Sequence, residues 1–316
     1  MQKRRLGNST LEVAPLTFGG NVFGWTADEA ISFRLLDGFF AAGYNFVDTA
    51  DVYSRWHTGN KGGESEIIIG NWLKARGNRD KVIIATKLGM DMGGDNKGLS
   101  RAYMMRAVED SLRRLQTDYI DLYQAHRDDP ATPLEETLSA FQTLIQQGKV
   151  RVIGASNYTA DRLALALDTS KKLGLPRYET HQPQYSIVER TEFEGPLQDL
   201  CVAEKVSVIG YYSLASGFLT GKYRAQADTA GRLRGARVEK YLNDKGFAVL
   251  EALDEVAATH HAKPGQVALA WLLAKPAVAA PIVSATNMEQ LAEMVKAPEI
   301  ALSAKDIARI DAASAA

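Results

Sequence analysis

Short apolar runs alternate along the chain with longer amphipathic segments. The runs are rich in β-branched and aromatic residues and end in polar ones. They occupy positions 16–20, 46–49, 82–86, 120–125, 150–155, 178–182, 206–211 and 281–284. Runs that are apolar on both faces are typical of buried parallel strands. The pattern therefore predicts eight strands of one parallel sheet.

Several segments between the runs have the spacing of helices. In 102–115 apolar residues recur at intervals of three and four, beginning with Met105 and Val108. Further helices are predicted at 134–147, 161–173, 248–261 and 264–274. The last two follow one another directly, and proline in a first turn marks the start of the second.

Eight strands with helices between them are the parts of a (β/α)₈ barrel. We therefore expect an α/β fold, a TIM barrel formed by residues 1–316 as a single domain, with two extra helices and long βα loops. A doubly wound open sheet is the alternative. That fold usually carries G-x-G-x-x-G after its first strand, and the sequence here is Gly19-Gly20-Asn21-Val22-Phe23-Gly24.

Composition and charge restrict the function. The 316 residues are 46% hydrophobic and 24% charged, with 37 basic and 38 acidic side chains and a net charge of −1. Such a balance gives no long-range field for nucleic acid or an anionic membrane. No apolar run approaches the ~20 residues of a membrane span. The lone Cys201 suggests a reducing compartment, so we expect a soluble, cytoplasmic protein.

Ionisable residues stand where successive strands end. Asp48 and Tyr53 follow the second run, Lys87 the third and His126 the fourth. In a barrel these ends form one mouth. A lysine ammonium should lower the pKa of a nearby phenol, a carboxylate should hold the lysine charged, and a histidine can orient a carbonyl oxygen or share in proton transfer. The set predicts a proton donor for carbonyl reduction, with hydride from another source.

Each of these residues also has a simpler interpretation. A single Asp or Lys at a strand end is often only a capped or solvated group, and Tyr53 alone would suit a rim aromatic. Asp51 competes with Asp48 as the partner of Lys87. No histidine pair has the spacing of a common metal motif, so no metal is expected. The remaining histidines are interpreted as one core group, His181, and three surface groups, His57, His260 and His261.

In this order the residues resemble the aldo-keto reductase superfamily, in particular its bacterial branch that is similar to potassium-channel β-subunits. The likeness is carried by 43–50 (Gly-Tyr-Asn-Phe-Val-Asp-Thr-Ala), 121–126, 151–157, 217–223 and 289–291. The resemblance implies a barrel that binds NADP(H) without a Rossmann domain. It also implies that Tyr53 is the general acid, that Lys87 and Asp48 tune it, and that His126 orients the substrate carbonyl.

The resemblance further implies how the cofactor is held. Ser156, Asn157 and Gln182 would bind the nicotinamide carboxamide, and Tyr211 would stack on the ring. Segment 213–240 would clamp the pyrophosphate through backbone N–H groups, with Lys222 and Arg232 near the phosphates. The implied cofactor positions are Gly20, Asn21, Asp48, Ser156, Asn157, Gln182, Tyr211, Ser213, Leu214, Ser216, Gly217, Leu219, Gly221, Lys222, Arg232, Ser284, Thr286, Gln290 and Glu293.

The clamp segment has an alternative interpretation as a mobile basic loop. The sequence also departs from the family near it, with Tyr211-Tyr212-Ser213-Leu214 in place of Tyr-Ser-Pro-Leu. Asn287 stands where NADP-preferring relatives have Arg or Lys, and Met294 where an Asn contacts adenine. The predicted preference for NADP over NAD therefore rests on Lys222 and Arg232 and is expected to be moderate.

The expected substrate walls are Phe23, Trp25, Trp56 and Arg127. The tryptophans would suit a sugar or an aromatic aldehyde, and Arg127 or Arg55 an anionic group, but all would equally suit a packed rim. We expect an NADPH-dependent reductase of a small aldehyde or ketone, with no nucleic-acid or membrane partner. The alternative is a cofactor-sensing regulatory subunit with slow or no turnover. The sequence makes no prediction of oligomeric state.

Overall fold

The strands form one closed ring. The computed structural model describes residues 2–315, and its eight-stranded parallel sheet has the order β10-β3-β4-β5-β6-β7-β8-β9. Val208 N donates to Ala277 O (2.7 Å) and Ala279 N to Val208 O (2.8 Å), which joins β9 to the segment before β10. The strands are β3 (Thr17–Gly19), β4 (Phe46–Asp48), β5 (Ile83–Leu88), β6 (Ile120–Ala125), β7 (Val150–Ser156), β8 (Thr180–Gln182), β9 (Ser207–Val208) and β10 (Ile282–Val283).

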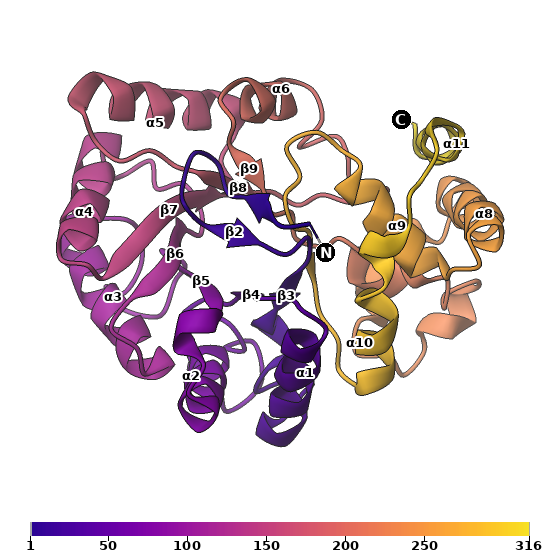
Figure 1. The fold of residues 1–316 in the computed structure, drawn as a ribbon, viewed down its shortest axis with the longest axis horizontal. Helices are drawn as coiled ribbons and strands as arrows, with labels where there is room; N and C mark the ends of the chain where they lie inside the picture. The colour runs from indigo at the N-terminus through magenta and orange to yellow at the C-terminus, as the bar shows by residue number, and fades with distance from the viewer. Residues whose placement is uncertain (1, 316) are drawn as a thin grey trace.

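Helices surround this ring (Figure 1). They are α1 (Glu29–Ala41), α2 (Glu64–Arg76), α3 (Arg101–Leu115), α4 (Leu134–Gln146), α5 (Ala160–Leu173), α6 (Pro196–Ala203), α7 (Gly235–Val238), α8 (Asp244–Thr259), α9 (Pro264–Leu273), α10 (Met288–Met294) and α11 (Ala304–Ser314). The α/β barrel predicted from the sequence is confirmed. Among residues 2–315 no helix is both long and apolar enough to cross a bilayer.

The boundaries differ from the predicted ones where a local contact overrides the apolar pattern. Helix α8 begins at Asp244 rather than at 248, because the Asn243 side chain accepts a hydrogen bond from Gly246 N (2.9 Å) and caps the helix. The seventh run shortens to β9, since beyond it Tyr211 N bonds to Pro183 O (2.9 Å) outside the regular ladder. Strand β5 extends to Leu88, which places Lys87 inside a strand.

A short N-terminal hairpin, which the sequence pattern did not predict, closes one end of the barrel. Its strands β1 (Arg4–Arg5) and β2 (Glu12–Val13) are antiparallel and too short for any periodicity to show. Figure 1 shows the hairpin across the ring of strands. Its apolar side chains form one cluster with inward-facing barrel residues: Leu6, Leu11, Val13, Phe46, Ala85, Leu122, Val152, Ile209, Ala279 and Ala280. The hairpin therefore fills this end of the barrel, and the site lies at the opposite end, where the strands have their carboxyl ends.

Candidate active site

A cavity of about 1110 Å³ opens at the carboxyl ends of the strands. Most residues singled out from the sequence line it. Those residues are Asn21, Trp25, Tyr53, Trp56, His126, Arg127, Ser156, Asn157, Gln182, Tyr211, Ser213, Leu214, Ser216, Gly217, Lys222, Arg232, Ser284, Thr286, Gln290 and Glu293. Asp48 and Lys87 lie fully buried behind Tyr53.

Lys87 is at the centre of the buried network. Its Nζ donates to Asp48 Oδ2 (2.7 Å), to the Thr49 carbonyl (2.8 Å) and to Tyr53 Oη (2.8 Å). An ammonium has three N–H donors, and here each has an acceptor. Burial lowers the pKa of Lys87 and the Asp48 carboxylate opposes this. The geometry is that of a charged lysine whose partner is Asp48.

Asp51, the rival partner, makes no such contact. Its side chain is buried, and neither carboxylate oxygen has a hydrogen-bond partner among the described residues. Burial and the neighbouring Glu66 raise the pKa of Asp51 to about 8, against the opposing charge of Arg114. At neutral pH this carboxyl is mainly protonated.

Tyr53 keeps its proton in this environment. Burial, followed by the Asp48 carboxylate, raises the pKa of Tyr53 well above its ordinary value. This corrects the prediction that the lysine lowers it, because burial and Asp48 outweigh the nearby ammonium. The phenol donates to Asp48 Oδ2 (3.2 Å) while accepting from Lys87. The site therefore holds a proton beside a group that would stabilise the phenolate.

His126 is neutral for related reasons. Burial, and then the charges of Lys87 and Arg127, lower the pKa of His126 well below its ordinary range. Its Nδ1 is buried without a partner in the described chain. The imidazole lies edge-on to the Tyr53 ring, with centroids 6.0 Å apart. A neutral imidazole offers one N–H and one acceptor, so this ring can donate to an oxygen in the cavity.

The other histidines separate as a core group and more exposed ones. His181 is fully buried, accepts from Tyr158 N (3.3 Å), and has its pKa lowered by burial to about 4. His57 and His261 are exposed. His260 differs from the prediction, because it is half-buried and its Nε2 lies 3.0 Å from Asp306 Oδ2.

The polar residues at the carboxyl ends of β7 and β8 are linked to one another and to Asp48. Gln182 Nε2 donates to Asp48 Oδ1 (2.9 Å). Ser156 Oγ donates to the Gln182 carbonyl (2.8 Å), and Asn157 Nδ2 to the His126 carbonyl (2.9 Å). Tyr211 Oη donates to Asn157 Oδ1 (2.8 Å). This cluster therefore connects the cavity wall to the buried network.

The far end of the cavity is built by α10 and its approach. Thr286 N and Oγ1 donate to Gln290 Oε1 (2.9 and 3.2 Å), and Glu293 pairs with Lys263. Asn287 caps α10 by accepting from Gln290 N (2.9 Å). Asn287, which stands where the resemblance implies an Arg or Lys, therefore caps the start of α10.

The segment after β9 has an unusual backbone. Tyr212, Ala215, Ser216 and Gly217 all have positive φ, of 60°, 47°, 59° and 93°. Residues other than glycine adopt this conformation at a cost, and such positions cluster at ligand sites. The structure thus bends this segment sharply along the cavity wall.

Several predicted backbone donors are not free in this bend. The N–H groups of Gly217 and Leu219 donate to the Leu214 carbonyl (2.8 and 3.3 Å), and that of Gly221 to Phe218 O (3.0 Å). Leu219 is buried in the core, and neither it nor Gly221 lines the cavity. These N–H groups are bonded within the sharp turns, and the pyrophosphate clamp stays a prediction.

Two further positions are corrected by burial. Phe23 is fully buried and stacks on Phe18 with centroids 5.3 Å apart, so it belongs to the core and not to a substrate wall. Gly20 is also buried and is not among the residues that line the cavity. The sequence alone does not show whether an apolar residue beside the first strand faces the core or the cavity.

Four cations of the same segment line the cavity without an acidic partner in the described chain: Lys222, Arg232, Arg234 and Arg237. Their neighbours Arg224 and Lys240 do have partners, Asp254 at 2.7 Å and Glu189 at 2.5 Å. Burial, Arg232 and Arg234 lower the pKa of Lys222. Sequence position does not separate paired from unpaired arginines, so Arg234 and Arg237 were not predicted as site residues. The cavity carries positive charge suited to an anion.

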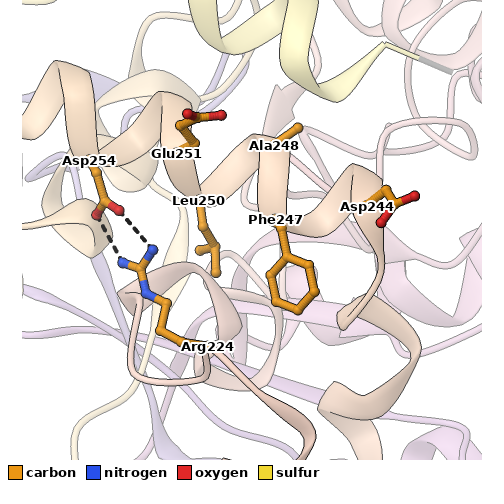
Figure 2. Close-up of a pocket in the computed structure, with 7 residues that line it drawn as sticks. All are labelled: Arg224, Asp244, Phe247, Ala248, Leu250, Glu251 and Asp254. Atoms are coloured by element: carbon orange, nitrogen blue, oxygen red, sulfur yellow. Dashed lines mark hydrogen bonds and ion pairs between the residues drawn. The ribbon is translucent and has the colours of Figure 1, made fainter.

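A second, shallower depression of about 480 Å³ lies against α8. Figure 2 shows Arg224 reaching Asp254 below the helix, with Leu250 and then Phe247 farther along the helix. The guanidinium donates to both carboxylate oxygens (2.7 and 2.9 Å). This place holds none of the predicted site residues. Nowhere in residues 2–315 do three or more His, Cys, Asp or Glu side chains form a group able to hold a metal.

Comparison with known proteins gives the family to which this barrel belongs. The profile of the Aldo/keto reductase family matches residues 15–315. Protein tas of Escherichia coli is 35% identical over 99% of this chain and 97% of its own length. A probable voltage-gated potassium channel subunit beta of Oryza sativa is 32% identical (95% and 92%), as is L-glyceraldehyde 3-phosphate reductase of E. coli (98% and 92%). The chain belongs to the aldo/keto reductase family of oxidoreductases.

Proposed function

We propose that the protein reduces the carbonyl group of a small aldehyde or ketone to the alcohol, with hydride from NADPH. The observation that carries this proposal is the buried Lys87, whose three N–H groups meet Asp48, Thr49 and Tyr53. Such a network serves no packing purpose that an apolar residue would not serve better, since burying an ion pair is costly. It suits a group that must lose a proton inside the cavity.

The chain's own residues supply the proton and its control. Tyr53 holds a proton at the cavity wall and donates it to a carbonyl oxygen that gains negative charge. The Lys87 ammonium stabilises the resulting phenolate, and Asp48 keeps the lysine in place. Neutral His126 orients the carbonyl oxygen by donating its N–H. Proton transfer of this kind contributes ~10²–10⁴-fold to the rate.

The cavity fits a phosphorylated nicotinamide cofactor, which supplies the hydride when bound. The unpaired charges of Lys222 and Arg232 flank Tyr223, with the cations 5.3 and 5.1 Å from its ring centre. They are the proposed ligands of the 2′-phosphate. Ser156, Asn157, Gln182 and Tyr211 line the same cavity as Tyr53 and are proposed to hold the nicotinamide end. The cytoplasmic location stays a prediction.

A regulatory subunit is the second candidate, because a relative of similar identity is named as a potassium-channel β-subunit. Such a protein would use the same cavity to sense the cofactor. The reductase name of another relative favours catalysis by comparison. Steady turnover of aldehydes by the purified protein would decide between the two.

The proposed chemistry is tested by NADPH consumption with a panel of aldehydes, in the native protein and in Tyr53→Phe. We expect turnover in the native protein and its loss in the variant. Tyr119→Phe is a matched control, because Tyr119 stacks on Arg79 outside the cavity. Unchanged turnover in Tyr53→Phe would contradict the role of Tyr53, and NADPH binding without turnover would favour the regulatory candidate.

A further inference from the structure

Two cavity arginines of the segment after β9 have no task in either the proposed proton transfer or the proposed cofactor binding. Arg234 and Arg237 both line the cavity. Arg234 is half-buried, and its guanidinium has neither a hydrogen-bond acceptor nor a carboxylate within the described residues. Burial, and then the charge of Arg237, lower its pKa. An unpaired charge removed from water is unfavourable, and an anionic group that entered here would offset that cost.

Aromatic side chains connect Arg234 to the proton donor. Its guanidinium lies over the Trp25 ring, 5.5 Å from the ring centre. Trp25 meets Trp56 edge-on at 5.8 Å, and Trp56 meets Tyr53 at 5.9 Å. The charge therefore lies two indole rings away from the phenol, along one wall of the same cavity.

Arg237 reaches the same region from the other side. Its Nη1 donates to Tyr212 Oη (3.1 Å), and the Tyr212 ring lies 5.4 Å from that of Tyr211. Thr26, next to Trp25, lines the cavity and has a buried hydroxyl with no partner in the described chain. Buried polar groups are normally bonded, so this hydroxyl is also available to a ligand.

These groups differ in position from the proposed cofactor cations. Lys222 and Arg232 lie over Tyr223, whereas Arg234 and Arg237 lie against Trp25 and Tyr212.

We infer that the substrate carries an anionic group, a carboxylate or a phosphate monoester, which Arg234 binds with Arg237 beside it. The inference rests on the proposed reductase function and names its substrate class. Trp25 and Trp56 would contact the part of the substrate between this group and the carbonyl. A guanidinium binds both kinds of anion through paired N–H donors.

The test compares matched aldehydes with and without the charge. 4-Carboxybenzaldehyde is paired with benzaldehyde, and glyceraldehyde 3-phosphate with glyceraldehyde, so that the two arms separate carboxylate from phosphate. In the native protein kcat/KM should favour the charged member of at least one pair about tenfold or more. Arg234→Gln should reduce kcat/KM for that member roughly ten- to hundredfold, the worth of one charge-assisted contact. At saturating NADPH, kcat/KM for the neutral aldehydes should fall much less than for the charged member, and Arg234→Lys should retain part of the preference.

Three measurements keep the outcomes distinct. Arg224→Gln, outside the cavity, should leave the preference unchanged. NADPH affinity is measured for each variant, because Arg234 also contributes to the environment of Lys222. If Arg234→Gln weakens NADPH binding but leaves the charged-to-neutral ratio unchanged, Arg234 belongs to the cofactor and the inference is wrong.

Binding without turnover provides an independent test. Because Arg234 lies over Trp25, titration with glycerol 3-phosphate and with benzoate should change tryptophan fluorescence in the native protein and much less in Arg234→Gln. Equal reduction of charged and neutral aldehydes would overturn the inference while leaving the reductase function intact. If no aldehyde is reduced, the proposed function fails, and the titration alone decides whether the anion site exists.

Discussion

Charged side chains are paired with one another at the floor of the cavity, formed by Lys87, Asp48 and Tyr53, but lack a carboxylate partner along its outer wall. At the floor, Lys87 and Asp48 are fully buried and satisfy one another and Tyr53 in the protein alone. Along the wall, Lys222, Arg232, Arg234 and Arg237 have no carboxylate partner within residues 2–315. The first arrangement is preorganised for a reaction, since its bonds need no ligand. The second has positive charges that a ligand must complete, so the floor suits chemistry and the wall suits recognition.

The largest expected effect comes from breaking the floor. Lys87→Met should lower kcat for a good aldehyde by ~10²–10⁴-fold, because it removes the charge that stabilises the phenolate. NADPH affinity should remain within a few-fold. Steady-state kinetics and fluorescence titration measure the two quantities.

Lys87→Met also leaves Asp48 buried without its partner, so its folding needs a check by circular dichroism. Lys149→Met is a suitable control, because it removes a surface ion pair with Glu109. A kcat within about threefold of the native value, below the range for general acid catalysis, would contradict the assigned role.

Removing a charge from the part of the wall that is proposed to bind the cofactor should have a smaller effect than Lys87→Met. Arg232→Ala should reduce the preference for NADPH over NADH by roughly ten- to hundredfold, since one charge-assisted contact is worth ~1.5–3 kcal/mol. Fluorescence titration with both reduced cofactors measures the ratio. Equal affinities in the native protein would refute the preference, and an unchanged ratio in the variant would assign the phosphate to Lys222 or Arg237.

The buried Asp51 allows a test of charge at the floor through stability. This carboxyl faces Glu66, Arg114, Lys87 and Tyr103, and its pKa is raised to about 8. The folded state binds the proton more tightly than the unfolded chain does. The stability from Asp51 is therefore complete below about pH 4, the ordinary value of an aspartate, and is lost as the pH rises towards about 8.

Asp51→Asn should accordingly be less sensitive to alkali than the native protein. The difference in slope should reach about 1.4 kcal/mol per pH unit at most, between about pH 5 and pH 8. Urea unfolding at several pH values measures it. Parallel pH profiles of the two proteins would show that Asp51 is ionised in the fold.

The smallest expected effect comes from substitutions beside the first strand, which distinguish a core residue from a residue of the cavity wall. Phe23→Leu should cost about 1 kcal/mol of stability, because it removes volume from a packed core, and should leave KM unchanged. Trp25→Leu, nearby but lining the cavity, should instead raise KM for aldehydes. A change in KM for Phe23→Leu would return that residue to the substrate wall.

The sequence alone determined the barrel and the candidates for its chemistry. Eight buried runs separated by helical segments left few architectures, and parallel strands bring their carboxyl ends to one edge. Asp48, Tyr53, Lys87 and His126 could therefore be grouped without coordinates. Their pairing could not, since Asp48 and Asp51 are equivalent in the chain and only the structure shows which one reaches Lys87 at 2.7 Å.

Tertiary structure decided everything that depends on burial and on partners distant in sequence. It raised the pKa of Tyr53 where proximity to a lysine alone predicted the reverse. In the folded chain Phe23 lies in the core, and the N–H groups of Gly217 and Leu219 are bonded within a turn. Arg234 has no carboxylate partner among the described residues, whereas Arg224 pairs with Asp254. Desolvation and ion pairing depend on what surrounds a side chain in space, and residues tens of positions away in the chain provide those surroundings.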